Sequence, residues 1–185
     1  MDWPANPLWD YALALYRQPE VEAACLELQQ RHGLDVNLVL LCCWQGSRGG
    51  ALDPATLRRA KAAVASWQAE VVRPLRALRR RLKVRLADPE AGSVAALWPE
   101  LAGDLRGRAL ALELDGERLA QLALARALAD PPPAAAPGAA LAAANLRLYW
   151  RFDGRDRHAL RIVLAQAFPD AATAEIAAAL TGLED

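Results

Sequence analysis

Polar side chains interrupt the most apolar stretch of the chain, GLDVNLVLLCCW at residues 33–44. Asp35, Asn37 and the preceding His32 could line a polar pocket beside a helix N-terminus. His32 could also activate a thiol of this stretch, because the thiolate is the reactive form of cysteine. A cysteine in an apolar helix, however, usually behaves as a small inert hydrophobic residue. We therefore predict no catalytic residue. A small helical enzyme or small-ligand binder, with its pocket at His32, Asp35 and Asn37, is the alternative function.

The spacing of metal-ligating residues argues against a metal site. The two histidines, His32 and His158, are far apart in the sequence, and neither CxxC nor HxxxH occurs. The adjacent Cys42 and Cys43 would point about 100° apart on a helix, so they could not hold one ion together. We expect no metal and no other cofactor.

The strongest charge signal is the basic run RPLRALRRRLKVR at residues 73–85. Residues 57–85 carry ten Lys or Arg and a single acid, Glu70. Steps of three and four residues place several of these cations on one face of a helix, with leucines on another. The candidate partner-binding residues are Arg73, Arg76, Arg79, Arg80 and Lys83.

This cationic face has several interpretations. It could bind an acidic protein, the phosphates of a nucleic acid or an anionic lipid surface. It could also be a solvated face that pairs with acids elsewhere in the fold, and the formal net charge of zero favours that interpretation. The acids considered are Glu100, Asp104, Glu113, Asp115 and Glu117. No base-reading motif is present, so we do not expect sequence-specific DNA binding. The leading hypothesis is a non-enzymatic binding or regulatory protein that contacts an acidic protein or other polyanion.

The composition predicts an all-α protein. Ala and Leu, which favour helices, dominate the apolar residues, whereas Ile and Phe are scarce. Cap residues, prolines and apolar spacing predict helices over residues 7–17, 19–32, 36–45, 54–86 and 94–129. Gly33 should end the second helix and Asp35 should cap the third. Pro74 should bend the fourth helix or divide it in two.

Three segments are predicted for the whole chain. A bundle-like helical core occupies residues 1–130, a Pro/Ala-rich spacer follows at 131–140, and a helical segment occupies 141–185. The packing of that last segment on the core stays open, as does the oligomeric state. Six tryptophans are predicted to tie helices together: Trp3, Trp9, Trp44, Trp67, Trp98 and Trp150.

Other features predict a cytoplasmic location. Three cysteines cannot form a disulfide framework, and free thiols fit a reducing compartment. The opening residues, MDWPANPLWD, lack the pattern of a secretory signal, and the apolar run LVLLCCW is far too short to cross a membrane.

Three stretches together resemble a known group of proteins. They are NPLWDYALALYRQPEVEAACLELQQRHGLDVNLVLLCCW, WQAEVVRPLRALRRRLK and AANLRLYW. In the first, the order of Trp9, Cys25, His32, Gly33, Asp35, Asn37 and Trp44 is the most specific. The pattern resembles an uncharacterised family of small, mainly proteobacterial proteins that is classed as a domain of unknown function, over roughly residues 6–150. The resemblance implies a bacterial, cytosolic, helical protein and supplies no reaction or catalytic residue.

Overall fold

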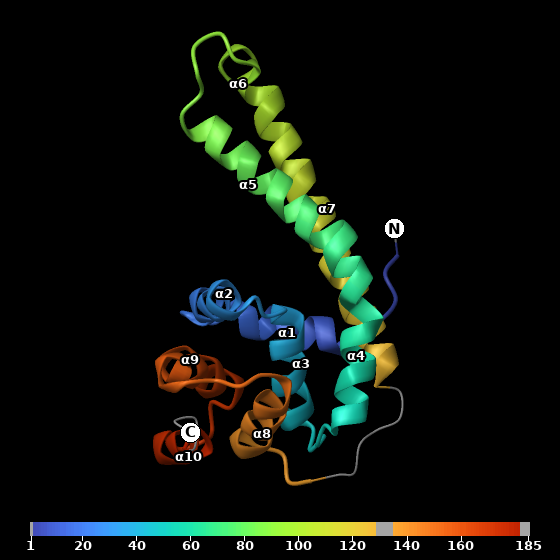
Figure 1. Cartoon of the computed structure of the whole chain (residues 1–185), viewed down its shortest axis with the longest axis vertical. Coiled ribbons are helices and arrows are strands. Elements are labelled where there is room, and N and C mark those ends of the chain that lie inside the picture. Colours follow the sequence, from blue (N-terminus) through green and yellow to red (C-terminus); the bar gives the residue numbers. More distant parts are fainter. Residues whose placement is uncertain (1, 129–134, 182–185) are drawn as a thin grey trace. The chain divides into compact units, whose positions relative to one another are not determined.

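The regular elements of the described residues are all helices, as predicted. The structure, a computed structural model, describes residues 2–128 and 135–181. Contacts divide the described residues into two compact units. We name residues up to 61 together with those from 121 onward the body, and residues 62–120 the hairpin (Figure 1).

Local signals set the first helices of the body. Helix α1 (Pro7–Tyr16) begins where the Asn6 side chain accepts a hydrogen bond from the N–H of Trp9, 3.2 Å away. Helix α2 (Val21–His32) ends at Gly33, whose φ of 67° is a left-handed conformation that glycine adopts readily. Helix α3 (Val36–Ser47) is capped by Asp35. The predicted starts and ends of these helices are confirmed to within about two residues.

Helix α3 is the core of the body and is buried on nearly every side. Helix α8 (Ala139–Tyr149) packs along it, and the approach is so close that a Cβ on Gly46 would lie 2.6 Å from the Cα of Ala142. Helix α9 (Arg157–Ala167) packs on α2, and α10 (Thr173–Ala179) packs on α8 and α9. The C-terminal helices therefore pack on the N-terminal helices, which answers the question left open by the sequence.

The predicted spacer at 131–140 falls partly outside the described residues, since the description resumes at residue 135. From there the chain is tied to the end of α3 and to the loop after it: the Gly138 N–H donates to the Gly46 carbonyl of α3 (3.1 Å), and the Ala135 N–H to the Gly49 carbonyl of the loop (2.8 Å). Helix α8 then begins within the predicted spacer. The division into domains at 131–140 stays a prediction, and the two compact units divide the chain at other positions.

The hairpin is built around a long helical run. Helix α4 (Pro54–Trp67) continues through a π-helical turn, η1 (Gln68–Val72), into α5 (Arg73–Ala87), so Pro74 does not divide the run. In the π turn the Arg73 N–H reaches back five residues to the Gln68 carbonyl. Such a turn accommodates a proline because the hydrogen-bond pattern is already shifted just before the missing N–H.

The chain returns through the short α6 (Val94–Leu97) and the long α7 (Pro99–Ala127), and α5 and α7 lie side by side (Figure 1). At the base of the hairpin the indole N–H of Trp67 donates to the Gly116 carbonyl, 2.9 Å away. Gly116 permits this approach, since a Cβ there would lie 3.3 Å from a methyl group of Val72.

Candidate functional site

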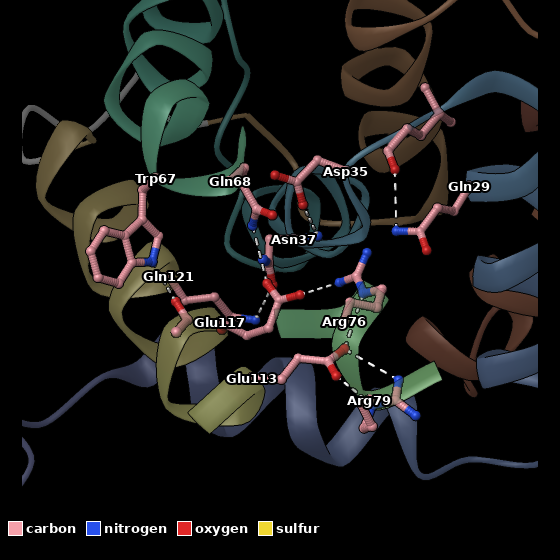
Figure 2. Close-up of polar contacts among 12 residues, drawn as sticks. Gln29, Asp35, Asn37, Trp67, Gln68, Arg76, Arg79, Glu113, Glu117 and Gln121 are labelled. Atoms are coloured by element: carbon pink, nitrogen blue, oxygen red, sulfur yellow. Dashed lines mark hydrogen bonds and ion pairs between the residues drawn. The ribbon is translucent and has the colours of Figure 1, made fainter. Parts of the chain in front are cut away.

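Two of the five predicted cations of α5 point into the hairpin. Figure 2 shows Arg76 and Arg79 on the carboxylate of Glu113: Arg76 Nε lies 3.0 Å from Oε1, Arg79 Nη2 lies 3.3 Å from the same oxygen, and Arg79 Nε bonds to Oε2. Arg76 also forms an ion pair with Glu117. These pairs tie α5 to α7. Glu113 and Glu117 are among the acids considered as partners of a solvated face, but both carboxylates are largely buried.

Glu117 also accepts a hydrogen bond from Gln68 Nε2 of the π turn, 3.1 Å away (Figure 2). The carboxylates of Glu113 and Glu117 are largely buried, so the arginines and Gln68 compensate for the water that they lose. The ion pairs of the hairpin are therefore structural, and they hold α5 against α7.

The other three predicted cations, Arg73, Arg80 and Lys83, are exposed. Arg81 and Arg85, also exposed, extend this set, although the sequence analysis did not include them. Arg85 lies 3.5 Å from Glu90 in a pair exposed on both sides, which contributes little. The predicted face is thus divided: Arg76 and Arg79 have partners within the hairpin, and partner binding stays a prediction for Arg73, Arg80 and Lys83.

A second surface of the hairpin is apolar and exposed. From Trp98, between α6 and α7, four large side chains recur every seven residues along α7, and each keeps a large exposed fraction: Trp98 (60%), Leu105 (47%), Leu112 (56%) and Leu119 (43%). We name these four residues and Leu101 (68% exposed) the apolar stripe. The prediction that the tryptophans tie helices together is therefore wrong for Trp98, although it describes Trp67 well.

The upper part of the apolar stripe borders a cleft of about 560 Å³ at the tip of the hairpin. Its lining is mostly apolar and comes from α5, from α6 and from the start of α7. The residues are Leu82, Arg85, Val94, Trp98, Leu101 and Leu105. The leucine spacing of α7 was visible in the sequence, but spacing alone does not reveal that no other element of the hairpin covers this face.

The candidate polar pocket consists of residues that already have partners. Asp35 accepts a hydrogen bond from the Asn37 N–H (2.9 Å), and its own N–H donates to the hydroxyl of Tyr149 (2.9 Å). The buried Asn37 accepts a hydrogen bond from Gln121 Nε2 at 2.7 Å (Figure 2). The predicted role of Asp35 as a helix cap is confirmed. No feature of the sequence marks Gln121 as the partner of Asn37.

His32 belongs to a separate cluster. Its Nε2 lies 2.8 Å from Oδ1 of Asp156, and Nη1 of Arg31 lies 2.6 Å from the same oxygen. The ring of His32 also faces the ring of Trp150 at 5.5 Å. Asp156 is fully buried. Burial opposes its ionisation, but hydrogen bonds from the Asp153 N–H, His32 and Arg31 hold its pKa below the ordinary value.

The three thiols are buried and unpaired with one another. Burial raises the pKa of Cys25 to about 12 and raises those of Cys42 and Cys43 further. Thiols with such pKa values stay protonated at neutral pH and are poor nucleophiles. The predicted inert role of these cysteines agrees with their surroundings.

Asn145 in α8 has a structural role that the sequence analysis did not predict. Its Nδ2 donates to the carbonyls of Gly50 (2.9 Å) and Cys42 (3.3 Å), and its Oδ1 accepts from the Leu52 N–H (2.9 Å). The side chain therefore joins α8 to α3 and to the loop that follows α3. An amide in the otherwise apolar run LAAANLRLYW was the available signal, because a buried amide needs partners.

Among the described residues, every helix is too short or too polar to reach across a lipid bilayer. The cytoplasmic location itself stays a prediction.

Comparison with known protein families gives one match. Residues 7–124 match the family model described as "Protein of unknown function (DUF2390)". Comparison with curated proteins finds no match, and neither does comparison with solved structures. The matched region covers α1 to α3 and the complete hairpin, so the predicted resemblance to a family of unknown function is confirmed, while the third stretch, AANLRLYW, lies outside the match. The chain belongs to this family.

Proposed function

We propose that this DUF2390 protein is a non-enzymatic binding protein whose hairpin contacts an acidic protein through α5. The observation that carries the proposal is the charge of that helix: residues 73–87 contain seven cations and no acid. Five of the seven are exposed, namely Arg73, Arg80, Arg81, Lys83 and Arg85.

The internal ion pairs support this role. Glu113 and Glu117 are engaged by Arg76 and Arg79 inside the hairpin, so these acids do not neutralise the exposed cations of α5. The same pairs hold α5 against α7, which reduces the ordering that binding would otherwise require. Contacts between exposed charges are screened by salt, so binding should weaken as ionic strength rises.

The alternative function, an enzyme or small-ligand binder at His32, Asp35 and Asn37, has less support. Asp35 caps α3, Asn37 is bonded to Gln121, and His32 is bonded to Asp156. Each of these contacts has a structural explanation in helix capping or in the packing of the body. We therefore do not propose it.

Charge reversal at matched positions tests the proposal. One variant carries Arg73→Glu, Arg80→Glu and Lys83→Glu in the hairpin, and its control carries the same reversal at three exposed arginines of the body, Arg17, Arg58 and Arg161. Both variants change the net charge by the same amount. The probe is a fluorescent glutamate-rich helical peptide, and its anisotropy is followed from low to high salt.

We expect the hairpin variant to weaken binding at low salt at least about tenfold, whereas the control should lose far less. Equal losses in the two variants would show a general charge effect and would overturn the proposal. Preference for RNA or for anionic vesicles over the peptide would also overturn it, because the partner would then not be an acidic protein.

A further inference from the structure

We infer that the apolar stripe and the tip cleft receive one amphipathic helix of the acidic partner, whose acidic flank lies against the exposed cations of α5. This inference rests on the proposed function and adds the form of the partner and its seat on the hairpin. It combines two features of the hairpin: the exposed apolar side chains of α7 and the exposed cations of α5. The proposed function uses only the cations.

The apolar stripe has the spacing of a helix-packing seam. Trp98, Leu105, Leu112 and Leu119 recur every seven residues, which is the repeat of positions that face a partner helix in a coiled coil. A hairpin of two helices buries one face of each and leaves a groove alongside. A third helix laid in that groove would bury the stripe and complete a three-helix arrangement.

The dimensions suit a helix. From Trp98 to Leu119 the stripe spans 21 residues, or about 32 Å at 1.5 Å per residue. The tip cleft at its upper end, bordered by Trp98, Leu101 and Leu105, can take a large apolar side chain of the partner. Trp98 is the natural anchor, since aromatic residues in partly open clefts commonly carry much of the binding energy of an interface.

The charges around the cleft favour an acidic partner helix. Arg85 lines the cleft, and its exposed pair with Glu90 can open at little cost. Arg80, Arg81 and Lys83 lie nearby on the same helix and are exposed. An incoming helix with glutamates beside its apolar face would therefore find Arg85 at the cleft and three further exposed cations within five residues of it on the same helix.

The same charges disfavour the other occupants. A second copy of the chain, docked tip to tip, would bring its own α5 cations to the same surface, where like charges repel. An anionic membrane would present negative charge to the whole face, including Glu100 and Asp104, which are exposed beside Leu101 and Leu105 on α7, whereas a helix can carry its acids on the α5 side alone.

The test uses a defined peptide and substitutions at exposed positions. The probe is a labelled 21-residue helix with leucines at three- and four-residue steps and glutamates on one flank; a second peptide carries lysine in place of every glutamate. The full-length protein carries Leu101→Asp with Leu112→Asp on the stripe, or Leu114→Asp as the control. Leu114 is on the same helix, off the stripe and about as exposed, and circular dichroism verifies that each variant is folded.

We expect the stripe variant to weaken binding of the acidic peptide by about a hundredfold, or about tenfold for each lost leucine contact. Leu114→Asp should change affinity less than about twofold, and the lysine peptide should not bind. A stripe variant that binds normally while the α5 charge reversal abolishes binding would overturn this inference and leave the proposed function standing.

Two further outcomes would overturn the inference. The wild-type protein could sediment as a dimer that Leu101→Asp with Leu112→Asp dissociates, which would assign the stripe to a second copy. It could instead bind phosphatidylglycerol vesicles in preference to the peptide, with a loss of vesicle binding in the stripe variant, which would assign the stripe to a lipid surface.

Discussion

The body and the hairpin treat polar and apolar side chains in opposite ways. The body buries an amide, Asn145, and a carboxylate, Asp156, deep among its helices and gives each of them several partners. The hairpin leaves large apolar side chains such as Trp98 and Leu101 in solvent, while its ion pairs lie between its two helices. A helix pair has too little interior to cover all of its apolar residues. The polar groups of the body therefore stabilise the body itself, whereas the hairpin exposes an apolar surface that a partner could bind.

The largest expected effect lies in the body, at Asn145. Replacing it with Ala leaves the Leu52 N–H and the carbonyls of Cys42 and Gly50 without that partner in a buried site. We expect the free energy of unfolding to fall by about 3 kcal/mol, measured by urea denaturation. Ala144→Ser, at the exposed neighbouring position, should change it by less than about 0.5 kcal/mol. A small effect at Asn145 would mean that water replaces the amide and that the body is less tightly closed than described.

Replacing a glycine with alanine should change the free energy of unfolding in opposite directions in the two regions. Gly46→Ala in the body forces a methyl group onto the backbone of Ala142 and should cost about 2–3 kcal/mol. Gly107→Ala in α7 meets nothing within 4 Å and removes a helix-weakening glycine, so it should stabilise the hairpin by about 0.5–1 kcal/mol. Thermal unfolding measures both. A stabilising Gly46→Ala would contradict the close packing of α3 on α8.

The buried carboxylate of Asp156 should make the body sensitive to acid. Because its folded pKa is lowered, its stabilisation is present above the ordinary aspartate pKa near 4 and is lost as pH falls through the lower folded value. Asp156→Asn should therefore cost about 2 kcal/mol at pH 7 and progressively less as the pH falls from about 5 to 3. Urea unfolding at each pH measures the difference. A difference independent of pH would show that Asp156 acts through packing and not through its charge.

The smallest destabilisation is expected at the ion pairs of the hairpin. Glu113→Gln weakens two charged partners at once, and we expect a local loss of about 1–2 kcal/mol. Amide hydrogen exchange should accelerate in α5 and the facing part of α7, while α3 and α8 keep their protection, since the hairpin and the body are separate compact units. Glu100→Gln, at an exposed acid of α7, is the control. Faster exchange throughout the body would contradict the separation of the two units.

The sequence predicted the local structure better than the surfaces. Asn6, Gly33 and Asp35 act through contacts with their immediate neighbours in the chain, so the helix limits they set could be predicted. The side chain of Asn37 could be identified as needing a partner, but that partner, Gln121, is distant in the sequence. A helical repeat shows that a face exists, but it does not show what the face contacts. For this reason the cationic face of α5 could be located, whereas the inward direction of Arg76 and Arg79 could not.

The π turn at Gln68–Val72 has a consequence for the register of the hairpin. A π turn acts as one inserted residue in an α-helix, and one residue corresponds to a rotation of about 100°. Every side chain after the turn is therefore displaced by that angle from the position that an uninterrupted helix would give it. The turn therefore sets the rotational register of α5. That register determines which arginines of α5 face Glu113 and which face solvent, where a partner could reach them.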